Sequence, residues 1–153
     1  MRVLGDAVEL VSVEPVSQQQ LARAHHRDFV AGALNGSTSN GFGNRDRKVA
    51  LSLSFTSGSL LAAAKHARLH REVTVSPTSG FHHAGYGQSR RFCTFKGFMV
   101  TALALKDAGP VDRVAILNCA AHYGDGTDSI IRALGIADAR KTAALCRIPK
   151  EIS

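Results

Sequence analysis

Alternating apolar and polar positions predict a strand, a helix and a loop in the first third of the chain. Residues 8–13 alternate enough to predict an early strand. Ser17 and Gln20 have the spacing of a capping box, which predicts a helix that begins here and ends around residues 32–36. The Gly, Ser, Asn and Thr residues of segment 35–44 then predict an exposed loop.

The middle of the chain has the pattern of an α/β protein. Helices are predicted over Ser59–Leu69 and Phe98–Lys106, and the second ends at the breakers of segment 108–110. Val73–Val75 predicts a short strand, and the unbroken apolar run Val114–Leu117 predicts a central parallel strand covered on both faces. This order of elements predicts a parallel sheet with helices on both faces, whose ligand site lies beyond the carboxyl ends of the strands.

Size and composition predict one globular domain over residues 1–153. The chain is 44% hydrophobic and 20% charged, which is typical of a protein with a packed core. Asp6 and Glu9 argue against a secretory signal, and no stretch approaches the ~18 apolar residues of a membrane span, so we expect a cytoplasmic protein without membrane contact. The three cysteines have no CxxC pairing, which predicts free thiols rather than disulfides or a thiolate zinc site.

The positive charge of the chain leaves a polyanionic partner open. The net charge is +7, and basic residues form short clusters within 45–48, 65–71 and 90–91. No nucleic-acid-binding motif accompanies them, so a solvated basic surface is the simpler interpretation. Nucleic-acid binding stays an alternative.

Three blocks of sequence carry the candidate chemistry. They are GFHHA at 80–84, FCTF at 92–95 and HYGDGT at 122–127. In this order the blocks resemble those of the zinc-dependent histone deacetylase family, which includes acetylpolyamine amidohydrolases and acetoin-utilisation proteins. The resemblance extends over residues 8–135 and is clearest over 73–135. It implies the arginase-deacetylase α/β fold, a three-layer arrangement of a parallel sheet between helices, here incomplete at its C-terminal side.

The resemblance assigns roles to the tandem histidines. His82 and His83 would flank a zinc-bound water at the end of a substrate tunnel, where imidazoles can exchange protons with the attacking water and the leaving amine. Asp125 would orient His83. Asn118 stands at the matching position beside His82, where an amide can accept a hydrogen bond but cannot stabilise an imidazolium by charge. Phe92 would form one wall of the tunnel.

By the same resemblance, two more residues of the first block, Gly80 and Phe81, would contact the substrate.

Taken alone, a His-His pair is more often a structural or surface pair, and that is our expectation for His25 and His26. The neighbouring blocks reverse this expectation for His82 and His83.

The metal ligands depart from the family pattern. The resemblance implies an Asp-x-His tripeptide and a second, distant Asp as zinc ligands, with one position left for water. Here the tripeptide begins with Ala120, whose methyl group cannot bind a metal, and His122 remains as the one matching ligand. The second Asp and the tyrosine that polarises the acetyl group have no counterpart in the chain. We therefore expect zinc, the cofactor of the family, to be bound weakly or not at all.

Further departures lie close to these blocks. Arg91 stands where a small glycine usually precedes the tunnel phenylalanine, and Tyr123 stands where a second histidine often follows the metal ligand. Residues 136–153 form a basic tail without the pattern of a buried strand.

Three functions follow as hypotheses. The first is a deacetylase-like protein that is inactive alone and acts as a binding or regulatory module, with an acetylated amine or lysine as a possible ligand. The second is one part of a split or oligomeric zinc-dependent deacetylase. The third is a basic scaffold for nucleic acid. We also expect a homo-oligomer, or a partner chain, to cover the face that the incomplete domain leaves open.

Overall fold

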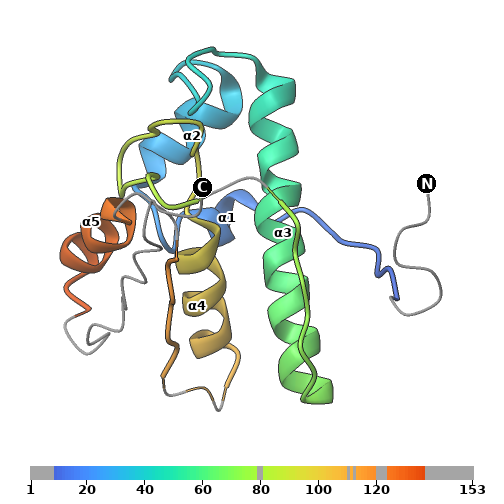
Figure 1. Cartoon of the computed structure of the whole chain (residues 1–153). Helices are drawn as coiled ribbons and strands as arrows, with labels where there is room; N and C mark the ends of the chain where they lie inside the picture. Colours follow the sequence, from blue (N-terminus) through green and yellow to red (C-terminus); the bar gives the residue numbers. More distant parts are fainter. Residues whose placement is uncertain (1–8, 79–80, 110, 112, 120–123, 137–153) are drawn as a thin grey trace, which may run out of the picture.

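Five helices form the framework of the part of the chain that the structure describes. The computed structural model describes residues 9–78, 81–109, 111, 113–119 and 124–136. In these residues the helices are α1 (Gln18–Leu21), α2 (Arg27–Asn35), α3 (Arg47–His70), α4 (Gly97–Asp107) and α5 (Asp125–Leu134). The long α3 packs against α4, while α2 lies across one end and α5 lies on the other side of α4 (Figure 1).

The capping box predicted from Ser17 is present. The Ser17 backbone N–H donates to Gln20 Oε1 at 2.7 Å, and the Gln20 N–H donates to Ser17 Oγ at 3.1 Å. The single helix predicted here is wrong, because the chain forms the separate helices α1 and α2. The His26 N–H donates at 2.9 Å to the carbonyl of Tyr86, a residue distant in sequence, so the turn between the helices is fixed by a tertiary contact.

One of the two longer helices has the limits predicted from the sequence, and the other begins earlier. Helix α4 agrees with the prediction, but α3 begins at Arg47, before the predicted start at Ser59. The Asp46 side chain caps it by accepting from the Lys48 N–H at 2.8 Å. Serine and threonine occupy several positions of its first half, including the buried Ser54 and Ser57, and so they hide the apolar periodicity.

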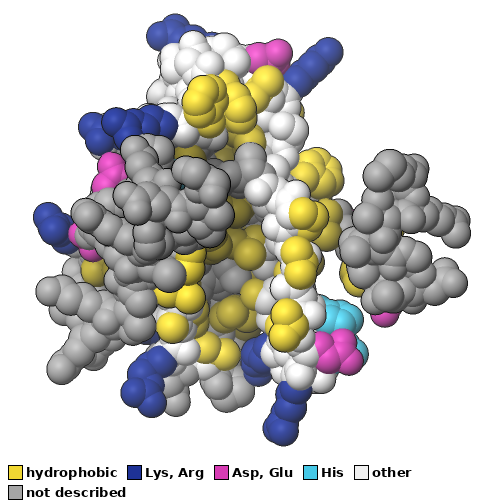
Figure 2. Space-filling model, viewed as in Figure 1, with side chains coloured by type: hydrophobic (Ala, Val, Ile, Leu, Met, Phe, Trp, Pro, Cys, Tyr) yellow, Lys and Arg dark blue, Asp and Glu magenta, His cyan; other side chains and the backbone are white. Residues whose placement is uncertain are grey.

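A core of apolar side chains joins the helices. α1 and α2 contribute Leu21 and Val30, α4 contributes Val100 and α5 contributes Ile130, and all four are fully buried. Figure 2 shows further hydrophobic side chains along α3 and between α3 and α4. No helix of the described residues is of a length and apolarity that would let it cross a membrane.

The predicted strands are not seen in the parts of the chain that the structure describes. Residues 9–13, 73–75 and 114–117 carry no strand pairing. Leu117, in the run predicted as a central parallel strand, is 61% exposed, whereas such a strand would be buried on both faces. Segment 73–76 instead runs beside α3 (Figure 1), held by Thr74 Oγ1 donating to the Ala63 carbonyl at 2.7 Å. A sequence can mark a segment as suited to a strand, but a strand forms only where a neighbour accepts its hydrogen bonds.

Candidate functional site

The tandem histidines meet the beginning of α5. His83 is buried, and its Nδ1 lies 2.7 Å from Oδ1 of Asp125, the first residue of that helix. The hydrogen bond expected between these two residues is therefore present. The His82 ring lies beside the His83 ring with 4.1 Å between centroids. Because Asp125 binds Nδ1–H, it fixes the tautomer of His83 that leaves Nε2 as an acceptor.

The environment of Asp125 favours its charged form. Burial alone would raise the pKa of this carboxyl group, but the hydrogen bond from His83 and the Gly126 N–H bring it below its usual value. The Arg90 guanidinium, with Nη1 3.7 Å from Asp125 Oδ2, acts in the same direction. Asp125 can thus stabilise a positive charge on His83.

A close approach of two backbones holds this geometry. The Gly126 N–H donates to the His82 carbonyl at 3.1 Å. A Cβ at Gly126 would lie 2.9 Å from that carbonyl oxygen and closer still to the carbonyl of Ala84, so the position accepts only glycine. The glycine of the GDGT block is what lets α5 bring Asp125 to the histidines.

Asn118 lies next to the same helix start. A Cβ at Gly124 would be 2.8 Å from Asn118 Nδ2, so the amide lies against the backbone just before α5. Its predicted role beside His82 stays a prediction. Gly80, Ala120 and His122 lie outside the described residues, and so do the predictions that concern them.

The two predicted substrate phenylalanines lie in different environments. Phe81 is buried, with its ring 5.3 Å from that of Phe98 in a T-shaped contact, so its position gives no support to a substrate contact. Phe92 is exposed, and its ring contacts that of Phe42.

Lys96 is a residue of this site that the sequence analysis missed. It is 1% exposed, and its Nζ donates to the carbonyl of His82 at 3.1 Å. Burial lowers the pKa of Lys96 to about 8, while Cys93 and Asp125 oppose the shift. One signal could have pointed to it: this lysine is the only charged residue between Phe92 and Val100.

The buried ring of His25 binds the backbone of Lys96. Its Nε2 accepts the Lys96 backbone N–H at 2.8 Å, so its Nδ1–H donates to the Gly85 carbonyl, also at 2.8 Å. Burial lowers the pKa of His25 to about 4, and the nearby Lys96 adds to the effect. The structural role expected for His25 is confirmed, since its ring joins the turn between α1 and α2 to the backbone of Gly85 and of Lys96.

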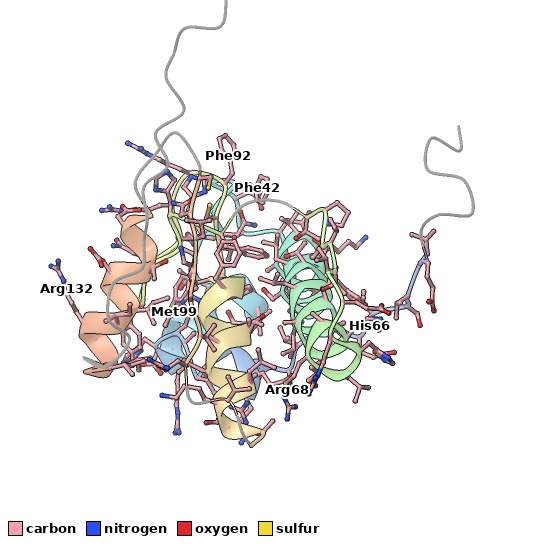
Figure 3. The ribbon with its side chains drawn as sticks, turned by 60° about the horizontal axis from the view of Figure 1, so that its bottom comes forward. Phe42, His66, Arg68, Phe92, Met99 and Arg132 are labelled. Carbon is pink, nitrogen blue, oxygen red and sulfur yellow. The ribbon has the colours of Figure 1, made fainter. Side chains whose placement is uncertain are left out.

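A cavity of about 300 Å³ opens beside the His83–Asp125 pair. Most of its lining residues have polar or charged side chains, and they come from the segment of the histidines and the loop after it and from α5. The lining residues are His83, Gly85, Gln88, Arg90, Asp125, Gly126, Asp128, Ser129 and Arg132. Figure 3 shows Arg132 reaching outward from α5. The volume lies at the small end of the range for ligand pockets.

The described residues contain no group of three or more His, Cys, Asp or Glu that could hold a metal ion. Ala120 stands where the resemblance implies a zinc-binding aspartate. Its methyl group cannot replace the charge that a carboxylate ligand brings to zinc. The residue that the chain has at this position does not fit a family-type zinc centre.

The fold and the paired histidine and aspartate define a deacetylase-like domain. The histone deacetylase domain matches residues 2–135, so the chain belongs to the histone deacetylase family, whose members are generally zinc-dependent. A solved structure described as the HDA15 HD domain superposes with a TM-score of 0.73 at 22% sequence identity. The match covers 85% of this chain and 38% of that one, and it shows the fold. A search of curated proteins found no match.

Proposed function

We propose that this chain is a deacetylase-fold binding module, which holds an acylated amine and does not hydrolyse it alone. The observation that carries the proposal is Ala120, which stands where the family resemblance implies a zinc-binding aspartate. Amide hydrolysis in this family requires an activated water. Without the carboxylate, the chain lacks the means to hold the metal that would activate it.

The retained residues suit recognition of an amide. With its Nδ1–H bound to Asp125, neutral His83 can accept a ligand N–H at Nε2, and protonated His83 can donate to a ligand carbonyl. The lowered pKa of Asp125 keeps the carboxylate charged at neutral pH. The cavity of about 300 Å³ has room for a small acyl-amide group.

A second candidate is one part of a split or oligomeric deacetylase. The 2.7 Å contact between His83 and Asp125 also suits this candidate, since an imidazole oriented by a carboxylate can exchange protons with a water and a leaving amine. The chain spans 38% of the HDA15 HD structure, so another chain could supply what is missing. The exposed apolar residues Val73, Val75 and Leu117 on segments without strand pairing support contact with a partner.

Metal content and turnover separate the two candidates. The purified chain, dialysed against zinc and then against buffer, should retain well under one zinc per chain by elemental analysis. It should release no acetate from an acetylated lysine peptide, with or without added zinc. One tightly held zinc, or turnover by the chain alone, would contradict the binding-module proposal. Turnover that needs a second chain would favour the split enzyme.

Binding provides the positive test. Calorimetry with the same acetylated peptide should detect an affinity that falls about tenfold in His83→Gln, the equivalent of one lost hydrogen bond. His70→Gln, at an exposed position at the end of α3, is the matched control and should bind as the unaltered chain does. Equal affinity in both variants would remove His83 from the binding site.

A further inference from the structure

A pair of histidines lies on one side of the last turns of α3. His66 and His70 stand four positions apart on this helix, and their ring centroids are 4.2 Å apart with 32° between the planes. Residues at this spacing lie on the same side of a helix, so the backbone itself brings the two rings together. His66 is half-buried and His70 is exposed, so both side chains reach solvent. Figure 2 shows histidine and acidic side chains next to one another at this lower end of α3.

The acidic neighbour is Glu72, whose Oε2 lies 3.6 Å from His66 Nε2. Glu72 turns back toward the helix because Arg71 ends α3 in the left-handed conformation, with φ 58° and ψ 40°. This conformation is disfavoured for residues with a Cβ, and at helix ends glycine commonly adopts it. The backbone at Arg71 is therefore strained, and backbone strain gathers at functional sites. Here the strained residue is the one that brings a carboxylate to the histidine pair.

Hydrogen bonds hold the chain after Glu72 against α3. Thr74 Oγ1 donates to the Ala63 carbonyl at 2.7 Å, and Ser76 Oγ donates to Ser59 Oγ at 2.9 Å. The segment therefore runs back along the helix, as Figure 1 shows. The two imidazoles are fixed by α3 and the carboxylate by this segment, so the three groups lie together before any ligand arrives.

Basic residues near the pair oppose the binding of a cation. They are Lys65, Arg68 and Arg71. Lys65 and Arg68 stand one and two positions from His66, which places them on other sides of the helix. Figure 3 shows His66 and Arg68 on different sides of α3. The negative end of the helix dipole and the Glu72 carboxylate act in the opposite direction. The basic residues therefore weaken a cation site here but do not exclude one.

We propose that His66 and His70 bind one divalent transition-metal ion, at a site that shares no residue with the family-type zinc centre. Two imidazoles on the same side of a helix can chelate an ion, and imidazole suits Zn²⁺, Cu²⁺ and Ni²⁺, whereas Mg²⁺ prefers oxygen ligands. No group of three His, Cys, Asp or Glu ligands is found in the described residues, so water completes the coordination. Glu72 accepts a hydrogen bond from a metal-bound water.

This site is weaker than a family-type centre, because it has two protein ligands where that centre has three. Its ion is lost on dialysis, so the expected absence of tightly held zinc still holds. The proposal is independent of the proposed function, since it involves neither the acylated amine nor the cavity beside His83.

Calorimetry with NiCl₂ on the untagged chain tests the site. One Ni²⁺ should bind per chain, and Mg²⁺ at the same concentration should not bind. His70→Gln should lose this binding, because glutamine offers no imidazole nitrogen. Glu72→Gln should weaken it by about tenfold, as expected when a group beside the ligands is altered.

His26→Asn is the matched control. His26 Nδ1 lies 3.8 Å from Asp28 Oδ2, so this histidine also has a carboxylate neighbour, but no histidine stands four positions from it. Asparagine is a favourable helix N-cap and so suits the first position before α2. The variant should bind Ni²⁺ as the unaltered chain does.

NMR of the unaltered chain gives a second readout that needs no substitution. Paramagnetic Ni²⁺ should broaden the imidazole signals of His66 and His70 first and those of His26 later. If His70→Gln fails to fold, this measurement decides. The proposal is overturned if the unaltered chain binds no Ni²⁺, if His70→Gln binds it undiminished, or if the signals of His82 and His83 broaden before those of the α3 pair.

Discussion

Acidification should destabilise this protein through His25. The neutral ring accepts the Lys96 N–H at Nε2 and donates from Nδ1 to the Gly85 carbonyl. A proton added at Nε2 would face the N–H of Lys96, so the charged ring would lose that bond inside the core. Burial and this arrangement together leave the pKa of His25 at about 4, against 6.5 for an unperturbed histidine.

The sign and size of the effect follow from proton linkage. Between pH 6.5 and about 4 the unfolded chain binds a proton at His25 that the folded chain does not, so stability falls as the pH falls. The difference between the two pKa values, at about 1.4 kcal/mol for each pH unit, corresponds to about 3 kcal/mol. Marginally stable domains have only about 5–15 kcal/mol in all. Asp125 adds to acid unfolding only below its ordinary value of 3.8.

Urea unfolding followed by circular dichroism between pH 4 and 8 measures this dependence. His25→Gln should be less stable at pH 7 by about 1–3 kcal/mol, because it loses the bridging ring. Its stability should also depend less on pH between 6.5 and 4, and His70→Gln should resemble the unaltered chain. If NMR titration of His25 gave a pKa near 6.5, or if His25→Gln kept the full slope, the reasoning would be refuted.

Three other expectations can be checked with single substitutions. Lys96→Met should raise the free energy of unfolding at pH 7 by about 1–3 kcal/mol, because a buried charge is removed. This gain should shrink between about pH 8 and 10.5, because over that range the folded unaltered chain has lost the Lys96 proton that the unfolded chain still holds. Gly126→Ala should cost about 1–3 kcal/mol in urea unfolding by forcing the histidine loop away from α5, whereas Gly87→Ala, with nothing within 4 Å, should be nearly neutral. Ala120→Asp should increase zinc retention on dialysis without restoring turnover; acetate release by this variant would show that the second acid is not needed.

The assembly state gives a further check, by light scattering at several concentrations. We expect a dimer or larger assembly, because exposed apolar side chains such as Val73 and Val75 favour contact with another chain. A monodisperse monomer at all concentrations would contradict this expectation.

Local sequence determined the features that depend on a few neighbouring residues. The Ser17 capping box joins groups three positions apart, and so it forms wherever the helix does. The breakers after α4 also lie where the sequence indicated, because glycine and proline do not continue a helix. The His83 and Asp125 pairing, 42 positions apart, followed only from the family resemblance.

Tertiary structure decided what depends on distant partners. Lys96 is a surface residue by type, and it became a buried one because His25, 71 positions away, and the His82 carbonyl bind its polar groups. The sequence placed Phe42 in an exposed polar loop. The structure shows that the backbone of this loop packs closely against Cys93 at Gly41. The predicted strands give the opposite case. Val73–Val75 has residues that favour a strand, but no other segment of the described chain pairs with it. Propensity is a property of a segment, whereas burial and pairing are properties of the neighbours that the fold brings to it.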